Sequence, residues 1–221
     1  MDHKVEILDI FSLTHDVKRI TTKKPNGYDF KPGQATEVAI DLPGFEDKKR
    51  PFTFTSLPED EHLEFVIKSY RDHNGVTKAI DGLVVGNSLI IGDAWGAIEY
   101  RGRGTFIAGG AGITPFISIL RDLNNKGSLT GNKLIFSNKT GKDVILEVDL
   151  NEMLQDHFTS VLTREEVEGH KHGRVDMAFL KENIHDFSQH FYVCGPDKMV
   201  KEINEFLQKL GANADALIFE K

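Results

Sequence analysis

The chain has 221 residues, of which 39% are hydrophobic and 9% aromatic, and its formal net charge at pH 7 is −7. A chain of this length and composition buries roughly 70% of its unfolded surface, which excludes a largely disordered protein and allows one large domain or two small ones. The acidic balance argues against a nucleic-acid partner, and no apolar run reaches the roughly 20 residues of a membrane span.

Metal and disulfide chemistry find little support in the composition. The single cysteine, Cys194, excludes an internal disulfide framework, a cysteine-only zinc site and an iron–sulfur cluster within the chain. The nine histidines show no metal-ligand spacing, and the first residues lack the apolar segment of a signal peptide. We expect a cytoplasmic protein without a bound metal.

The first hundred residues are rich in strand signals. Residues 51–56 alternate strictly between two kinds of side chain, as a half-buried strand does, and residues 76–83 are long enough for about two helical turns. The predicted strands are 5–12, 19–23, 34–41, 51–56, 63–69 and 89–92. Short strands separated by Gly and Pro turns are typical of an antiparallel barrel or sandwich, and we assign a β-barrel domain to residues 1–102.

The pattern changes near residues 101–104, where short apolar runs begin to alternate with longer amphipathic segments. The predicted strands are 105–108, 134–137, 160–163, 191–194 and 216–219, and the predicted helices are 115–124, 148–155, 176–183 and 198–210. Such alternation predicts an α/β domain over residues 103–221, with a doubly wound parallel sheet and right-handed crossovers.

The strongest local motif is the segment GGAGITP at residues 109–115, which follows an apolar strand and opens a helix. Glycines permit close backbone approach, and free N–H groups at a helix start favour a bound anion by about 0.3–2 kcal/mol. A dinucleotide pyrophosphate fits such a loop; a plain strand-to-helix turn is the alternative. The Rossmann fingerprint is incomplete, because Pro115 takes the third glycine position and no acidic residue ends the next strand.

Three weaker segments carry candidate chemistry. In RPFT at residues 50–53, an arginine can clamp a phosphate and an aromatic ring on the same strand face can stack on a planar ligand, although an ordinary strand reads the same way. GVT at 75–77 begins a helix, where threonine either caps the helix or faces a phosphate. CGP at 194–196 follows a strand at the sheet edge that binds ligands, where a cysteine is otherwise a small core residue.

The order of these four segments resembles that of the ferredoxin–NADP⁺ reductase superfamily, which includes flavodoxin reductases, cytochrome b5 reductase-like enzymes and oxygenase reductase components. The family pattern is Arg-x-Tyr-Ser/Thr, Gly-x-x-Ser/Thr, Gly-Gly-x-Gly-x-Thr-Pro and Cys-Gly-Pro, and the match covers almost the whole chain. The resemblance implies FAD in the barrel and a nicotinamide nucleotide, NAD(P)H, on the second domain.

The resemblance also implies roles for single residues. Arg50 contacts the FAD pyrophosphate, Phe52 stacks on the isoalloxazine ring, and Thr53 hydrogen-bonds near flavin N5. Phe52 replaces the family's tyrosine, which removes a phenol hydrogen bond and keeps the stacking. The loop before Gly75 is short and polar, so FMN or loosely held FAD stays open if the adenine half of the cofactor is not gripped. The other residues implied at the flavin are Pro51, Val66, Lys68, Gly75, Val76 and Thr77. Trp95 stands where the family has a glycine-bounded turn, and we expect it to cover part of the flavin.

On the nucleotide side, the resemblance implies that Gly110, Gly112 and Thr114 cradle the nicotinamide nucleotide. Cys194 and Gly195 approach the nicotinamide, and Glu220 belongs to a C-terminal segment beside the flavin. Thr53, Cys194 and Glu220 are therefore the predicted catalytic residues. Lys139, Arg164 and Arg174 are candidates to meet a 2′-phosphate and favour NADPH slightly, although residues 136–146 also resemble the matching stretch of NADH-using cytochrome b5 reductases.

The implied function is an oxidoreductase that moves a hydride from NAD(P)H to FAD and then passes single electrons to ferredoxin, flavodoxin or a heme protein. A cytochrome b5 reductase-like enzyme, or a ferric or flavin reductase using NADH, is a second interpretation. A flavin-free binding or regulatory protein on the same fold is a third.

Overall fold

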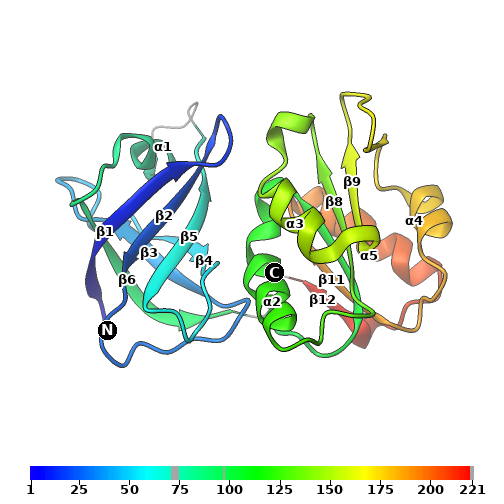
Figure 1. Cartoon of the computed structure of the whole chain (residues 1–221), viewed down its shortest axis with the longest axis horizontal. Helices are drawn as coiled ribbons and strands as arrows, with labels where there is room; N and C mark the ends of the chain where they lie inside the picture. Colours follow the sequence, from blue (N-terminus) through cyan, green and yellow to red (C-terminus); the bar gives the residue numbers. More distant parts are fainter. Residues whose placement is uncertain (71–74, 97, 220–221) are drawn as a thin grey trace.

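The computed structural model describes residues 1–70, 75–96 and 98–219. Figure 1 shows two lobes side by side: the first half of the chain forms a β-barrel, and the second half forms a sheet flanked by helices. One lobe holds a six-stranded antiparallel sheet and the other a six-stranded parallel sheet. The predicted fold class, a barrel followed by an α/β domain, is confirmed.

The barrel sheet has the strand order β4-β3-β6-β1-β2-β5. Its edge strands meet at a single bridge between Phe54 and Phe65, which nearly closes the sheet on itself. Both phenylalanines are fully buried, because alternate residues of each strand point into the barrel core. The strands are β1 (His3–Ser12), β2 (Val17–Lys23), β3 (Ala35–Ile40), β4 (Arg50–Thr53), β5 (His62–Lys68) and β6 (Ser88–Trp95).

The barrel's helix is shorter than predicted. Over residues 76–83 the structure has one turn of α-helix, α1 (Val76–Ala79), followed by a 3₁₀ turn at Ile80–Gly82. Val76 and Ile80 lie four residues apart and are both buried in the barrel core, so only one face of this segment is apolar. Gly82 is a poor helix former and ends the segment.

In the second sheet all strands are parallel, in the order β10-β9-β8-β7-β11-β12. Its strands are β7 (Gly104–Gly109), β8 (Lys133–Asn138), β9 (Phe158–Leu162), β10 (Lys171–His172), β11 (His190–Cys194) and β12 (Leu217–Phe219). The short, charged strand β10 was not predicted, because it has no apolar pattern. The longer helices are α2 (Thr114–Asn125), α3 (Glu147–Leu154), α4 (Met177–Asn183) and α5 (Asp197–Lys209).

Successive residues of β7 point to opposite faces of this sheet. Phe106 packs in a cluster with residues of α2 and α3, while Ile107 packs in a second cluster with residues of α4 and α5. Helices therefore cover both faces, as expected for a doubly wound sheet. Within the described part of the chain, every helix is too short or too polar to cross a membrane.

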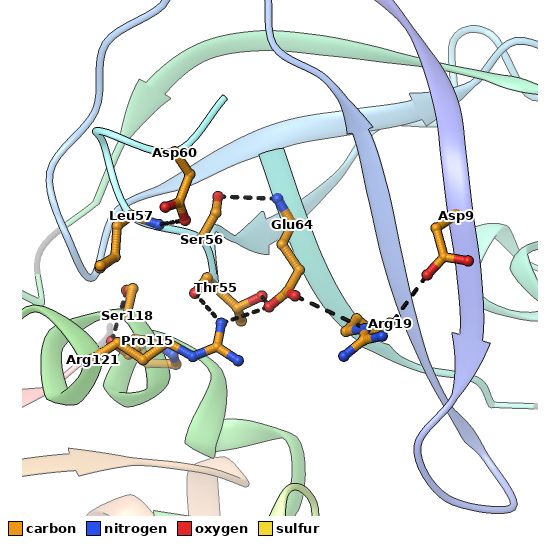
Figure 2. Close-up of polar contacts among 10 residues, drawn as sticks. All are labelled: Asp9, Arg19, Thr55, Ser56, Leu57, Asp60, Glu64, Pro115, Ser118 and Arg121. Carbon is orange, nitrogen blue, oxygen red and sulfur yellow. Dashed lines mark hydrogen bonds and ion pairs between the residues drawn. The ribbon is translucent and has the colours of Figure 1, made fainter. Parts of the chain in front are cut away.

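The two lobes share one hydrophobic cluster and several polar contacts. Val17 and Val66 of the barrel belong to the same cluster as the residues of α2. The Gly33 N–H donates to Ser118 Oγ at 3.0 Å, and a side chain at this position would lie 2.3 Å from the Ile98 carbonyl oxygen, so only glycine fits. Arg121 of α2 reaches into the barrel (Figure 2). These contacts hold the barrel against α2.

Arg101 and Gly102, in the connection that leads to β7, are hydrogen-bonded to Tyr192 of β11. The Tyr192 hydroxyl accepts hydrogen bonds from the N–H groups of Arg101 and Gly102 and donates one to the Gly102 carbonyl at 2.7 Å. Burial raises the pKa of Tyr192, so this hydroxyl keeps its proton at neutral pH. The predicted division between residues 102 and 103 falls in this connection and stays a prediction.

Candidate functional site

The barrel opens on one side of the bridge that closes it. On one side of the Phe54–Phe65 bridge, the Thr55 N–H donates to the Glu64 carbonyl at 2.9 Å, and pairing continues. On the other side, Thr53 and Val66 stand where the next pair would form, yet β4 has only β3 as a ladder partner and β5 has only β2 in the described chain. We call this opening the β4–β5 seam, and we call the two strand segments that border it, Arg50–Thr53 and residues 66–68, its lips.

One lip of the seam is the strand that carries the RPFT segment. Arg50 and Phe52 share a face of β4, because side chains alternate along a strand. Arg50 is exposed, and its Nη1 donates to the carbonyl of Lys49 at 2.8 Å. Phe52 is half-buried against the barrel core, and Thr53 is half-buried opposite Ala35. Pro51 has no N–H to leave unpaired on this edge strand.

The other lip points toward the second lobe. Val66 is only 4% exposed and shares a hydrophobic cluster with Ile113 and Cys194, so its backbone, and not its side chain, is what it can offer a ligand. The Lys68 ammonium forms an ion pair with Asp16 at 2.9 Å. The predicted flavin residues on both strands thus lie along a single opening, and Lys68 is held there by a carboxylate.

Charged groups of both lobes meet at the Lys68 end of the seam. His15 Nε2 lies 3.6 Å from Asp16 Oδ2 and 3.8 Å from Asp143 Oδ1. Burial raises the pKa of Asp143, but hydrogen bonds from Thr140 and the charges of Lys68 and His15 outweigh it, and the net pKa is below its usual value. His15, Asp16 and Asp143 each offer one atom that could bind a metal ion, and these three atoms lie within 4.8 Å of one another. The Lys68 ammonium already supplies positive charge to this group.

The GVT segment begins α1. Gly75 is the N-cap residue with an extended backbone, and no side chain caps this helix end among the described residues. The alternative that threonine is the cap is therefore wrong: Thr77 is the second residue of the helix. Val76 is buried in the barrel core, so only its N–H can meet a phosphate.

The two glycine loops of the second lobe are in contact. Ala108 of β7 is directly opposite Cys194 of the neighbouring strand β11, so both loops leave the same edge of the sheet. A Cβ atom on Gly112 would lie 2.4 Å from the Cys194 carbonyl oxygen and 2.5 Å from the Gly195 N. Gly112 is thus required by the approach of the two loops, which only the tertiary structure reveals.

Gly110 of the first loop borders open space. Gly110 has φ +53°, and a Cβ there would meet nothing within 4 Å. Thr114 Oγ1 donates to the Ala111 carbonyl at 3.0 Å and closes the turn into α2, whose first turn contains no acidic residue. Strands β8 and β11 lie on opposite sides of β7, so the strand order reverses at this loop. The backbone N–H groups at the start of α2 therefore stand where doubly wound sheets bind ligands.

The cations predicted for a 2′-phosphate are only partly together. Lys139 and Arg164 are neighbours at the ends of β8 and β9, where the Arg164 N–H donates to the Lys139 carbonyl at 2.9 Å. Arg174 is instead ion-paired with Glu202 of α5 at 2.6 Å. Glu165 was missed: its Oε2 accepts from the Gly141 N–H at 2.8 Å, beside Lys139. Its place directly after the predicted strand 160–163 was a usable signal.

Two further predictions concern Trp95 and Glu220. Thr53 and Trp95 are both directly opposite Ala35, on β4 and β6, so the three side chains point to the same face of the sheet. Trp95 is 42% exposed and lies two strands from Thr53, and its contact with the flavin stays a prediction. Glu220 lies outside the described residues.

Comparison with known proteins places two domain families on this chain. Residues 3–121 match the family described as FAD-binding domain, and residues 106–205 match the oxidoreductase NAD-binding domain. The chain is 26% identical over its whole length to the reductase component of propane 2-monooxygenase from Rhodococcus jostii (strain RHA1). It is 31% identical over 81% of its length to NADH-cytochrome b5 reductase 1 of Mortierella alpina.

The chain spans 63% and 64% of the lengths of these two relatives. Among solved structures, a ferredoxin NADP⁺ reductase from Neisseria gonorrhoeae with bound FAD and NADP superimposes with a TM-score of 0.85 at 21% identity, over 99% of this chain and 98% of that one. The fold of this chain, a barrel followed by a parallel sheet, is therefore shared with that structure.

Proposed function

Because the chain belongs to the family of FAD- and NAD-binding oxidoreductases that includes ferredoxin reductases and cytochrome b5 reductases, we propose that it moves a hydride from NAD(P)H to FAD and then delivers single electrons to a carrier protein. The proposal rests on one observation: a single hydrophobic cluster reaches from the β4–β5 seam to the paired glycine loops. Val66 on the seam, Ile113 behind the first loop and Cys194 before the second all belong to it. This supports a ring bound at the seam and a ring bound at the loops meeting over that cluster.

The residues along these openings suit the two cofactors. Arg50 has an exposed guanidinium for a pyrophosphate, and the N–H groups at the uncapped start of α1 suit phosphate oxygens. The free edges of β4 and β5 offer backbone N–H and C=O groups to the polar atoms of a flavin ring. Gly110, with its positive φ and open surroundings, leaves room for the phosphates of the nucleotide. Gly75, Val76, Thr77, Gly112, Thr114 and Gly195 complete the proposed contacts.

Bound FAD supplies the two-electron to one-electron conversion that protein side chains cannot perform. The chain's own contribution is position: holding donor and acceptor in contact removes much of the entropic barrier of a bimolecular transfer. We assign to the Thr53 hydroxyl a hydrogen bond at the reacting nitrogen of the flavin. Cys194 would contact one face of the nicotinamide ring. The hydrophobic cluster around Val66 would keep water away from the place where the two rings meet. Glu220 stays a predicted member of this group.

The electron acceptor is proposed to be ferredoxin, flavodoxin or a heme protein. One relative is named as the reductase component of a monooxygenase, which supports a protein acceptor in an oxygenase system, and the other is named as a cytochrome b5 reductase, which supports a heme-protein acceptor. The 31% identity to the cytochrome b5 reductase favours a heme-protein acceptor and NADH as the second candidate function.

Anaerobic reduction followed by addition of acceptors tests the proposal. Purified protein loaded with FAD should be yellow, and NADPH or NADH should bleach its absorbance before ferredoxin, flavodoxin or a cytochrome restores it. A protein that takes up no FAD would instead be the flavin-free binding or regulatory protein. The only tryptophan, Trp95, gives a second readout, because flavin bound near it quenches its fluorescence.

A further inference from the structure

A cavity lies at the amino-terminal edge of the parallel sheet, opposite the edge from which the glycine loops leave. Its volume is about 290 Å³, near the lower end of the range in which proteins bind small molecules. It is lined by residues at the amino-terminal ends of β7 and β8 and by the segment that leads into β11. The glycine loops leave the carboxyl-terminal edge of the same strands, so this cavity is separate from the proposed nucleotide site.

Three basic side chains line the cavity: Arg103, Lys133 and His185. Lys133 is directly opposite Thr105 in the sheet, and Arg103 precedes Thr105 by two residues, on the same side. A Cβ atom on Gly131 would lie 2.9 Å from Arg103 Cδ, so a glycine there lets the arginine lie across the loop beside Lys133. No hydrogen bond or ion pair joins these three side chains to any other residue in the described ranges 1–70, 75–96 and 98–219.

The rest of the cavity lining is polar and fixed by hydrogen bonds. Thr105 Oγ1 donates to Gln189 Oε1 at 3.1 Å, and Gln189 Nε2 donates to the Asp186 carbonyl at 2.7 Å. Asp186 Oδ1 accepts from the N–H and the hydroxyl of Ser188, which lowers the pKa of that carboxyl. The lining therefore carries one carboxylate, already bonded within its own turn, against two permanently charged cations and a histidine.

We propose that this cavity binds a small anion that carries a phosphate group. Arginine and lysine side chains without a protein partner are the donors that bind phosphate most strongly, arginine through two parallel hydrogen bonds and lysine as a point charge. The room beyond these cations is larger than one phosphate needs, so a diphosphate or a phosphorylated small molecule fits the site better than inorganic phosphate. The ligand is recognised without contact to the β4–β5 seam or the glycine loops.

Calorimetric titration of the FAD-loaded protein with pyrophosphate tests this assignment. NAD⁺ is present at saturation, so that pyrophosphate cannot occupy the glycine loops. The wild type should bind one pyrophosphate, and the double substitution Arg103→Ala/Lys133→Ala should weaken binding at least about tenfold, since each charge-assisted hydrogen bond contributes more than a neutral one. Both side chains are exposed, so the double variant should keep the unfolding temperature of the wild type and its rate of flavin reduction by NAD(P)H.

The matched control removes two exposed lysines of α5 with the same change in charge, Lys201→Ala/Lys209→Ala, and should change the affinity less than about twofold. Lys133→Arg should keep binding. Parallel titrations with inorganic phosphate and with AMP show whether one phosphate is enough or whether a larger ligand is preferred. Absence of pyrophosphate binding by the wild type, equal binding by the double variant, or an equal loss in the α5 control would each overturn the proposal.

Discussion

Glu165 accepts a hydrogen bond from the Gly141 N–H at 2.8 Å, which fixes one carboxylate oxygen just after the end of β9. Lys139 and Arg164 are joined by a backbone hydrogen bond at the same place. A nucleotide whose ribose reaches the carboxyl ends of β8 and β9 therefore meets both signs of charge. A carboxylate suits a free 2′-hydroxyl, and the cations suit a 2′-phosphate.

Glu165→Gln should raise the ratio of kcat/KM for NADPH over that for NADH by roughly fivefold, because the repulsion of a 2′-phosphate is removed at an exposed site. Lys139→Ala should lower the same ratio. Steady-state rates with both nucleotides measure it. A ratio within twofold of the wild type in both variants would show that neither residue reads the 2′ position. An equal loss of activity with both nucleotides would likewise contradict a role at the 2′ position.

Thr53→Val should slow reduction of the flavin by NAD(P)H in stopped flow, because the side chain keeps its shape but loses its hydroxyl. A decrease of about tenfold or more is expected if the hydroxyl bonds to the reacting nitrogen. Thr53→Ser keeps the hydroxyl and should restore most of the rate. FAD content and thermal stability should match the wild type. An unchanged reduction rate in Thr53→Val removes this residue from the mechanism.

Gly112→Ala should weaken nucleotide binding, because its Cβ would lie 2.4 Å from the Cys194 carbonyl oxygen and push the two loops apart. The KM for the nucleotide should rise at least about tenfold, while FAD binding to the barrel is kept. Gly82→Ala is the matched control: it adds the same methyl group where nothing lies within 4 Å and φ is not positive. Equal KM values in the two variants would contradict the loop contact.

Arg121 should couple to Glu64 across the lobes. Its Nη1 lies 2.8 Å from the Thr55 carbonyl and 2.7 Å from Glu64 Oε1, and Thr55 Oγ1 donates to the same carboxylate oxygen (Figure 2). Both side chains are largely shielded from water, so each single substitution, Arg121→Ala or Glu64→Gln, should lower the free energy of unfolding by about 1–3 kcal/mol.

A double-mutant cycle with urea unfolding measures this coupling. Because the two side chains share hydrogen bonds, the double variant should lose about 1 kcal/mol less than the sum of the single variants. Lys126→Ala is a useful reference, since that lysine forms an exposed pair with Asp122 on the same helix and should cost less than about 0.5 kcal/mol. Strict additivity of Arg121→Ala and Glu64→Gln would deny the inter-lobe pair.

Asp143 should give a stability that depends on acid pH. Its pKa is lower in the folded protein than in the unfolded chain, so its contribution is complete above the unfolded pKa of about 3.9 and is lost as the pH falls through the folded pKa. Asp143→Ala removes the carboxylate that bonds to the N–H and the hydroxyl of Thr140, and should cost about 1 kcal/mol at pH 7.

Urea unfolding of Asp143→Ala and wild type at several pH values checks this. The gap between the two should shrink as the pH falls below 4. Asp149→Ala, in the exposed first turn of α3, is the control and should show a smaller gap. A gap for Asp143→Ala that stays constant from pH 7 to strongly acidic solution would mean that the ionised carboxylate is not what stabilises the Thr140 turn.

The sequence by itself determined the elements and their class. Period-2 alternation placed the barrel strands, and alternating apolar runs and amphipathic segments placed the parallel sheet, because both patterns depend on contacts between residues a few positions apart. The charged two-residue strand β10 was missed because it has no apolar pattern. In the barrel helix the sequence did not show that the second turn is a 3₁₀ turn rather than α-helix. The order of the motifs along the chain also indicated the family.

Only the tertiary structure decided which residues meet. The opening between β4 and β5 depends on where one bridge, Phe54–Phe65, closes the barrel, and the register Thr53–Ala35–Trp95 depends on pairing across three strands. Gly112 is a packing residue because of Cys194, 82 positions away, and Glu165, which follows β9, accepts a hydrogen bond from Gly141, which follows β8. Such contacts join segments far apart in the chain, so no local pattern encodes them; they follow from how the sheets twist, close and bury their apolar faces.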